Sequence, residues 1–192
     1  MKLPVVQYGH PVLRQKGARI EKITPEIEQL IDDMLETMYD AKGVGLAAQQ
    51  VAKALQLTVI DVRDAVERPS TLELNGASAD PASIMPLVLI NPEWTAVNDP
   101  VEGAEGCLSF PEIYGDIFRP ESIDVTATGR KGEMIRFRCG GLLARAIQHE
   151  YDHLHGVLFI DRMDKPTLKK IKPELDGLVY STRNALKKAK RR

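Results

Sequence analysis

The sequence predicts an α+β fold in which mixed or antiparallel β-sheets pack around a central helix, with another helix at the C-terminus. Three observations carry this prediction. Strand-like apolar runs dominate the middle of the chain, helical periodicity marks residues 25–41, and a second helical pattern follows the strands over 140–156. Strands followed by a helix with a buried face are typical of α+β proteins.

The first helix is expected over residues 25–41. Its apolar residues recur at spacings of three and four, Thr24 can serve as the N-cap, and Pro25 fits the first turn. The segment GVGLAAQQ starts at Gly43, where we expect this helix to end.

The expected strands are LQLTVIDV (55–62) and IMPLVLINP (84–92), the second ending at Pro92, and a hairpin formed by SIDVTATG (122–129) and EMIRFRC (133–139). Between the first two, residues 63–83 are polar and rich in Pro, Gly, Ser and Ala, which predicts a long loop or insertion. The helix at 140–156 stops at Gly156, and a final helix is expected within 166–190.

The size and composition are those of a soluble globular protein. We expect residues 1–192 to form a single domain, long enough to fold without disulfide or metal staples. Hydrophobic residues make up 43% and charged residues 28%, which argues against a disordered or membrane protein. The N-terminus lacks an apolar signal-peptide region and no run is long enough to span a bilayer, so we expect a cytoplasmic location.

Charge is distributed unevenly along the chain. The net charge is −1, but residues 165–192 contain ten Lys and Arg against two acidic residues, a net charge of +8 that leaves −9 for the rest. A basic tail over 166–192 can bind a polyanion such as a ribosome surface, and a solvated helix is an equally good interpretation.

The segment AIQHEYDHLHG (146–156) contains an H-E-x-x-H pattern formed by His149, Glu150 and His153. Residues four apart lie one above the other on a helix, so the two imidazoles can bind one metal ion. Glu150 can then act on a metal-activated water without being a ligand. His155 lies two residues past His153 and should point away from the site, as a capping or surface residue, and His10 is expected to be structural.

Such a site needs a third ligand. Zinc proteases with this motif take a Glu or His from downstream, but Phe159 stands where the extended motif needs His, and the only later Glu is Glu174 in the tail. Upstream, Cys107 lies in a glycine-rich segment that we expect to be irregular and able to expose the sulfur.

The second cysteine, Cys139, ends a predicted strand and is expected in the core, and a Cys107–Cys139 disulfide would be unusual in the cytosol. Cys107 is therefore the better ligand.

Two imidazoles and one thiolate leave a coordination position open for water, as in a catalytic site. A metal lowers the pKa of such a water, and Glu150 can accept its proton, which indicates hydrolysis. Amide hydrolysis also needs donors for the developing oxyanion; Gln49 and Gln50 and the N–H of Leu108 are candidates. On coordination grounds alone, zinc is the first choice of metal.

The segments GVGLAAQQ, EGCLS and QHEYDH, in this order and at these separations, resemble the peptide deformylases of bacterial type. The likeness extends through HPVLR, VLINP and GVLFIDRM and covers most of residues 1–165. By this resemblance Cys107, His149 and His153 would bind the metal. The other implied roles are general base and proton donor for Glu150, oxyanion stabilisation for Gln50 and the Leu108 N–H, and substrate binding for Val44, Gly45 and Leu142.

The same resemblance implies removal of the formyl group from the N-terminal formylmethionine of nascent polypeptides, with release of formate. It changes the expected metal to one Fe(II) ion per chain, for which zinc, nickel or cobalt can substitute. Ribosome contact through the basic tail is implied too, without a membrane and without direct sequence-specific nucleic-acid binding.

The sequence departs from the family pattern at Glu112, where many members have Gly, at Arg145, where an apolar residue is frequent, and in a long segment at 64–85. These departures concern the rim and pocket of the substrate cleft. Two other functions stay open from the sequence: a zincin-type metallopeptidase using the same helix, and a non-enzymatic metal-dependent or ribosome-binding module.

Overall fold

The computed structural model describes residues 1–189 and has the α+β fold that the sequence predicts. Its elements, in chain order, are η1 Pro11–Arg14, α1 Pro25–Asp40, β1 Gly45–Ala47, η2 Ala48–Val51, β2 Leu57–Ile60, β3 Ser70–Leu74, β4 Ala77–Ala79, η3 Pro81–Ile84, β5 Leu87–Ala96, β6 Pro100–Cys107, β7 Phe110–Pro120, β8 Ser122–Thr128, β9 Met134–Gly140, α2 Gly141–Leu154, η4 Phe159–Arg162, α3 Lys165–Lys170 and α4 Lys172–Ala189. The η segments are short 3₁₀ turns.

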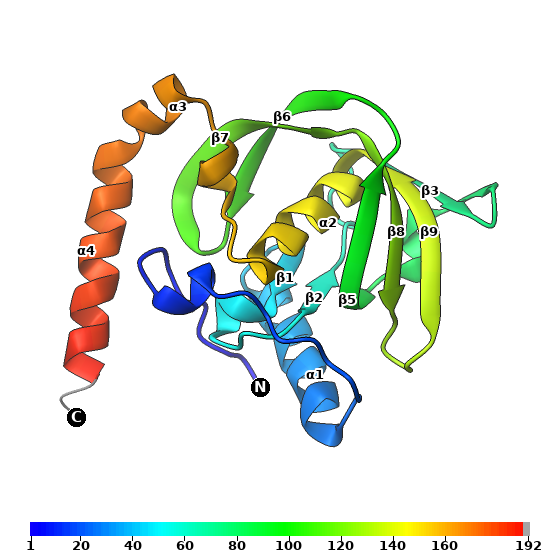
Figure 1. Ribbon diagram of the computed structural model, residues 1–192, viewed down its shortest axis with the longest axis horizontal. Coiled ribbons are helices and arrows are strands. Elements are labelled where there is room, and N and C mark those ends of the chain that lie inside the picture. The colour runs from blue at the N-terminus through cyan, green and yellow to red at the C-terminus, as the bar shows by residue number, and fades with distance from the viewer. Residues whose placement is uncertain (190–192) are drawn as a thin grey trace.

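Two antiparallel sheets contribute to the fold. The larger has seven strands in the order β1-β2-β5-β8-β9-β3-β4, and the smaller is the β6–β7 pair. Helix α2 runs through the middle of the molecule, with strands β5, β8 and β9 to one side of it and the long β6–β7 pair arching over the other (Figure 1). No strand of the large sheet pairs with β6 or β7 among the described strands, so α2 lies between two separate sheets.

The large sheet buries both of its faces where β2 and β5 lie. Leu87 and Leu89 of β5 pack in one apolar cluster with Leu143 and Ile147 of α2. The alternate β5 residues, Val88 and Ile90, pack in another cluster with Ile31, Met34 and Met38 of α1. Because successive side chains of a strand point to opposite faces, the continuous apolar run of β5 lets one strand hold both helices.

Strand β5 extends beyond the end that the sequence predicts. Pro92 does not terminate it: the strand continues to Ala96 and pairs with β8, with a register shift between Ile90 and Glu93. Asn91 has a positive φ of 50° within this bulge. A bulge is one of the few places in a sheet where proline removes no needed ladder hydrogen bond, which is why the proline alone is misleading.

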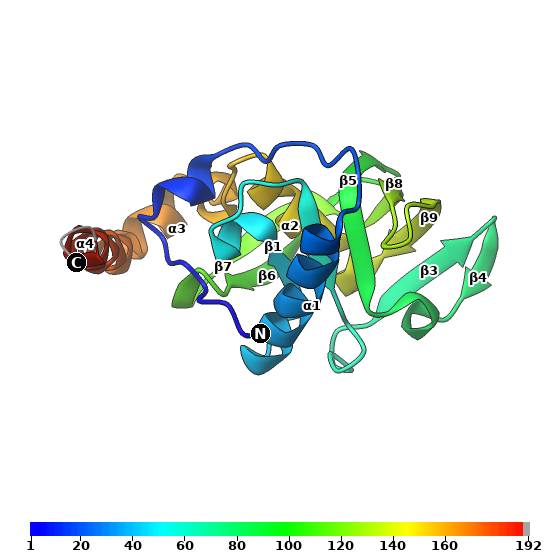
Figure 2. The same cartoon turned by 90° about the horizontal axis from the view of Figure 1, so that it is seen from below.

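The long loop or insertion predicted at 63–83 is not a loop throughout, because about half of it is a hairpin. Residues 70–79 form the β3–β4 hairpin, and β3 pairs with β9 to extend the large sheet. Its turn is Asn75-Gly76, with φ values of 52° and 77°, the left-handed conformations that a two-residue hairpin turn requires. The hairpin projects at the end of the molecule opposite α4 (Figure 2).

The segment around Cys107 is a strand and not irregular. Strands β6 and β7 pair from Pro100–Pro120 to Gly106–Tyr114, and the register shifts between Gly106 and Cys107. The prediction is wrong because glycines at 103 and 106 suggest a flexible loop. Gly106 is instead covered by the ring of Tyr114, which a Cβ at 106 would approach to 2.7 Å.

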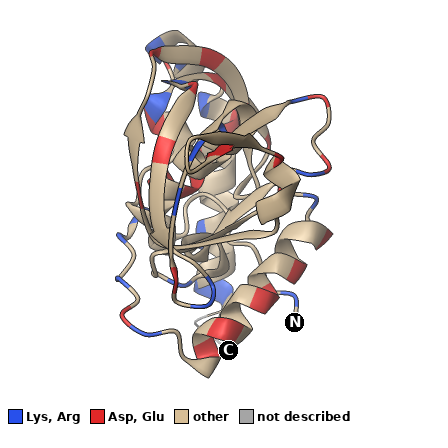
Figure 3. Cartoon of the chain, turned by 90° about the vertical axis from the view of Figure 1, so that its right-hand side faces the viewer, with Lys and Arg blue, Asp and Glu red and all other residues tan. Residues whose placement is uncertain are grey.

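The three predicted helices are confirmed. Helix α1 begins after Thr24, although the Thr24 side chain makes no cap hydrogen bond, and the C-terminal helix is divided into α3 and α4. The last part of the basic tail, residues 190–192, lies outside the described residues. Helix α1 contains six acidic and no basic residues, so in Figure 3 it shows the red of Asp and Glu and no blue. Within residues 1–189, no helix is both long and apolar enough to cross a membrane.

We predict that Leu143→Ala destabilises the protein by about 2–5 kcal/mol, because Leu143 is fully buried between α2 and the large sheet and its truncation leaves a cavity. Chemical denaturation measures this change. Met134→Ala, at a side chain that is 71% exposed, is the control and should change stability by less than about 0.5 kcal/mol. Equal effects of the two substitutions would contradict the packing described here.

Candidate metal centre

Helix α2 presents His149 and His153 on one buried face. Their ring centroids are 5.0 Å apart, and both side chains are almost fully buried. The helix holds them because its neighbouring residues Leu143 and Ile147 fix it against the sheet. The packing of α2 against the sheet therefore fixes the positions of the two imidazoles.

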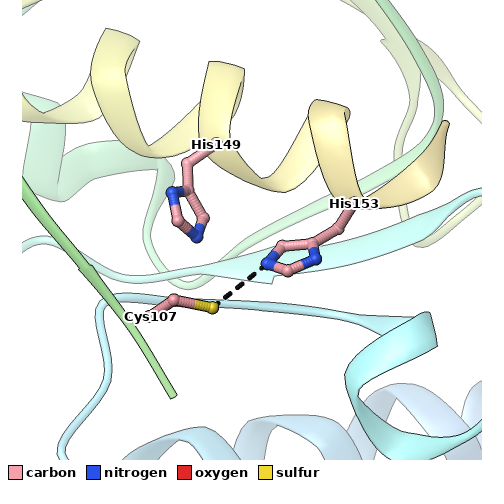
Figure 4. A group of neighbouring side chains, drawn as sticks. All are labelled: Cys107, His149 and His153. Carbon is pink, nitrogen blue, oxygen red and sulfur yellow. Dashed lines mark hydrogen bonds between the residues drawn. The ribbon is translucent and has the colours of Figure 1, made fainter. Parts of the chain in front are cut away.

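Cys107 approaches the histidines from the end of β6. Its Sγ lies 3.3 Å from Nε2 of His153, and the candidate ligand atoms of Cys107, His149 and His153 all lie within 4.8 Å of one another. Figure 4 shows the thiol and both rings directed at a common point between strand and helix. The structure thus brings together the three residues that the sequence analysis selected, across 42 positions of the chain.

The environment of the rings suits metal binding. Nδ1 of His149 bonds to Oε2 of Glu105 at 2.9 Å, which leaves Nε2 free for an ion. Burial, with the neighbouring His149, lowers the pKa of His153 well below its ordinary value, so this ring is neutral, as a ligand must be. One thiolate and two imidazoles form a donor set that binds Zn²⁺, Fe(II) and similar ions, so the residues present fit a divalent metal.

Glu105 is the functional residue that the sequence analysis missed. Its carboxylate is 5% exposed and also accepts hydrogen bonds from Arg119 Nε (2.5 Å), Arg119 Nη2 (2.9 Å) and Arg145 Nη1 (3.0 Å). Burial opposes ionisation, but the bonds from His149 and Arg119 outweigh it and keep the pKa of Glu105 well below its ordinary value. Its place two residues before Cys107 was the available signal, since a carboxylate so close along the chain to a candidate ligand can reach the same site.

Glu150 lies in the same site with its carboxylate almost fully buried. Burial raises the pKa of Glu150 to about 7, and its Oε2 makes no hydrogen bond to the described protein groups. Gly45 leaves the space that this carboxylate occupies, because a Cβ at 45 would lie 2.4 Å from Oε1 of Glu150. A carboxyl with a pKa near neutrality and an unpartnered oxygen is suited to transfer protons at physiological pH.

Gln50 points its amide nitrogen into the site. Its Oε1 accepts a hydrogen bond from the Ala47 N–H at 2.8 Å, and this fixes the orientation of the amide. Nε2 then faces Cys107 Sγ at 3.5 Å and Ser109 Oγ at 3.4 Å. Gln49, the other glutamine of the pair, is fully buried and does not line the cavity, so Gln50 is the one of the two that is placed to donate to a substrate.

A cavity of about 490 Å³ opens beside these groups. Val44, Gly45 and Leu142 line it, as does Leu108, together with Glu150 and His149. Two of the departures from the family pattern also reach it: Arg145 forms part of the wall, and Glu112 lines it with a positive φ of 60°, a conformation that glycine adopts more easily. Arg68, from the long 64–85 segment, completes this part of the lining.

The remaining histidines and the second cysteine lie outside the cluster. His155 is the C-cap residue of α2 and donates from Nδ1 to the Tyr151 carbonyl at 2.9 Å. His10 caps η1 by accepting from the Val12 N–H at 3.2 Å. Cys139 is buried in the core, where burial raises the pKa of its thiol to about 12, and both cysteines are free. The expectations for these residues are confirmed.

Comparison with known proteins bears on this geometry. Residues 2–169 match the family described as polypeptide deformylase. The chain belongs to the polypeptide deformylase family. A peptide deformylase of Opitutus terrae is 47% identical over 189 residues, which cover 97% of this chain and 98% of that protein.

Solved deformylase structures share the fold of this chain. The crystal structure of a deformylase from Thermus thermophilus matches with a TM-score of 0.79 at 35% identity, over 94% of this chain and 99% of that one. A Synechococcus elongatus deformylase matches with a TM-score of 0.76 at 40% identity, covering 90% and 85% of the respective chains. Polypeptide deformylases are metalloenzymes, and the cluster of Cys107, His149 and His153 is a possible metal-binding group in this member.

We predict that Glu150 makes the stability of the metal-free protein pH-dependent. Its native pKa is about 7 against an ordinary value of 4.5, so between these values the folded state holds a proton that the unfolded state has lost. Stability relative to Glu150→Gln should therefore fall, by no more than about 3.5 kcal/mol, as pH rises from about 4.5 to 7, and then level off.

Urea denaturation of both metal-free proteins across this pH range measures the difference. Taking the difference removes the titration of groups that the two proteins share. A difference that stays constant with pH would contradict the burial-raised pKa.

Proposed function

We propose that this deformylase removes the formyl group from N-terminal formylmethionine of newly synthesised polypeptides and releases formate. The observation that carries the proposal is the convergence of Cys107, His149 and His153 beside Glu150 and Gln50 at one cavity. Membership of the polypeptide deformylase family supports the same hydrolase reaction. The names of the relatives give the substrate class, and the site supplies the chemistry.

Cys107, His149 and His153 would hold one divalent ion per chain. Fe(II) is the proposed ion, with zinc, nickel or cobalt as substitutes, because a thiolate with two imidazoles accepts each of these. A bound divalent ion polarises a carbonyl and lowers the pKa of water. Cys107 is partly exposed, so a ferrous form should be sensitive to oxygen.

Glu150 is the proposed proton carrier. It takes a proton from the attacking water, whose oxygen adds to the formyl carbon, and gives it to the amine nitrogen when the C–N bond breaks. The immediate products are formic acid and a free N-terminal amine, and transfer of the acid proton to the amine gives formate and an ammonium group, so atoms and charge balance. A pKa of about 7 favours both steps, because the carboxyl can accept and then release a proton near neutral pH.

Gln50 and the backbone N–H of Leu108 are the proposed oxyanion donors. The Gln50 amide is held by the Ala47 N–H, so its Nε2 is oriented before substrate arrives. Gly45 would contact the substrate backbone, and Val44 and Leu142 would contact the methionine side chain in the same cavity. Gly45 also leaves room for Glu150, so a side chain there would disturb both partners.

The alternative of a zincin-type metallopeptidase is not favoured. The zincin pattern needs a further ligand downstream of the helix, and Phe159 there is buried against Phe110 at a ring distance of 5.1 Å. The third donor comes from Cys107 instead. A non-enzymatic role is disfavoured because a proton carrier and an amide donor accompany the metal-binding group.

We predict that two substitutions separate metal binding from turnover. Glu150→Gln should keep the metal and lower kcat for a formyl-Met peptide by about 10²–10⁴-fold, because it removes the proton carrier only. Cys107→Ala should lose the metal. Metal analysis after anaerobic Fe(II) or Ni(II) loading, combined with formate release, measures both effects.

His155→Ala is the matched control, since His155 lies on the same helix but outside the cluster, and it should keep both metal and activity. Full metal content in Cys107→Ala would show that the ligand assignment is wrong. Absence of formate release from loaded wild-type protein would remove the proposed function itself.

The chain is proposed to act as one catalytic domain in the cytoplasm, with α3 and α4 as a ribosome-binding appendage and no sequence-specific nucleic-acid contact. Figures 1 and 2 show α4 at one end of the molecule, beside η1 and away from the large sheet. The basic side chains of its last turn are Lys187 and Lys188, and the last turn of α3 contributes Lys169 and Lys170. An exposed basic helix beside an acidic body is suited to contact ribosomal RNA phosphates.

We predict that reversing these four lysines to Glu weakens co-sedimentation with ribosomes at least about tenfold at low salt, because the contact is electrostatic. Hydrolysis of a short formyl-Met peptide should be unchanged, since none of these four lysines lines the cavity. Reversal of four other exposed lysines, Lys16, Lys22, Lys53 and Lys131, is the control for net charge. Equal loss with both sets would indicate nonspecific attraction, and no loss with either would remove the proposed contact.

A further inference from the structure

Arg145 continues the row of site residues on α2. It lies one helical turn before His149, which itself lies one turn before His153, so the three side chains share a face of the helix. Arg145 is only 9% exposed. A buried guanidinium on the face that carries the two candidate ligands is costly and requires partners.

The partners of Arg145 all lie on the β6–β7 pair. Nη1 donates to the Ile117 carbonyl at 2.8 Å, to Oε1 of Glu105 at 3.0 Å and to the Gly103 carbonyl at 3.3 Å, and Nη2 donates to the Val101 carbonyl at 3.0 Å. The guanidinium lies against the strand because residue 103 is glycine: a Cβ there would lie 2.7 Å from Cζ and Nη2 of Arg145. One side chain of α2 is thereby bonded to the backbones of both β6 and β7.

A second arginine crosses the same junction in the opposite direction. Arg119 of β7 donates to Glu105 and, through Nη1, to Oδ2 of Asp152 on α2 at 2.8 Å. The β6–β7 pair has no backbone pairing with the seven-stranded sheet among the described strands. The position of Cys107 relative to α2 therefore depends on side-chain contacts such as these two.

We propose that Arg145 is a positioning residue that holds the strand carrying Cys107 at a fixed distance from the helix carrying His149 and His153. The inference rests on the proposed function, because it assumes that these three residues bind one metal ion. Arg145 does not touch the ion. It acts by bonding the β6–β7 backbone to α2 one turn from His149, and it limits the separation of the sulfur from the two imidazoles.

The proposal is tested by measuring the rate at which cobalt-loaded protein releases its metal to a chelator. Arg145→Met keeps the length of the side chain and leaves Glu105 bonded to Arg119 and His149, so no buried charge loses all its partners. We expect release into excess chelator at least about tenfold faster than in wild type, as for other groups that hold metal ligands in place. The cobalt–thiolate absorption band should also weaken or shift, which a loss of stability alone would not produce.

Three further variants sharpen the result. Arg145→Lys should fall between wild type and Arg145→Met, because one ammonium group cannot reach all four acceptors. Gly103→Ala keeps Arg145 but displaces its guanidinium, and should accelerate release in the same direction. Arg138→Met is the matched control. Arg138 is an exposed arginine of β9 that bonds to Asp124 of β8, so its loss should leave the metal release rate and the cobalt spectrum unchanged.

Wild-type release and spectrum in folded Arg145→Met would overturn the proposal. If thermal unfolding shows that Arg145→Met is not folded, Gly103→Ala decides, and its behaving like wild type would overturn the proposal as well. Failure of the proposed metal site is a different outcome. In that case wild-type protein itself would bind cobalt without a thiolate band.

Discussion

The arrangement of the site depends on one buried carboxylate, that of Glu105. It accepts hydrogen bonds from His149 on the helix, from Arg119 on β7 and from Arg145 on the helix. Asp152 continues this network by accepting from Arg119 and from Arg162 (2.6 Å) of η4. Buried charges are stable only when paired in this way, so the two chain segments that carry the candidate ligands cannot separate without leaving charges unpaired.

The rest of the molecule supplies a rigid support for that junction. The large sheet is buried on both faces where β2 and β5 lie, with α1 against one face and α2 against the other. Helix α2 is thus fixed along its length, and its histidines need no freedom to find an ion. Gln50 and Gly45 reach the same cavity from the β1 side, where β1 pairs with β2 of the large sheet. Cys107 of the small sheet and Gln50, which follows β1, meet beside α2, where Gln50 Nε2 lies 3.5 Å from Cys107 Sγ.

Residue type and spacing predicted much of the site. His149 and His153 could be paired because residues four apart lie on the same face of a helix. Cys107 could be preferred as the third ligand because the downstream residues and Cys139 were poorer candidates. The resemblance to deformylases supplied the roles proposed for Gln50 and Leu108. The partners of Glu105 could not be predicted, because they join Arg119, Arg145 and His149 from three elements that only the tertiary fold brings together.

The errors in the predicted fold have a common physical origin. Three features of the sequence each suggest an end of regular structure: Pro92, the glycines near Cys107 and the Asn75-Gly76 pair. Each is accommodated inside a sheet: the proline at a bulge, Gly106 beneath the ring of Tyr114, and Asn75-Gly76 as the tight turn of a hairpin. Local propensity marks such positions correctly as unusual, but strand pairing decides whether the chain continues through them.

X-ray absorption at the metal edge of the zinc-loaded protein tests the central claim most directly. The ligand set of Cys107, His149 and His153 predicts one sulfur scatterer at about 2.3 Å and two imidazole nitrogens at about 2.0–2.1 Å, with one further light ligand. A spectrum with only nitrogen and oxygen neighbours would contradict the account, because the thiolate distinguishes this site from the protease sites that share its helix motif.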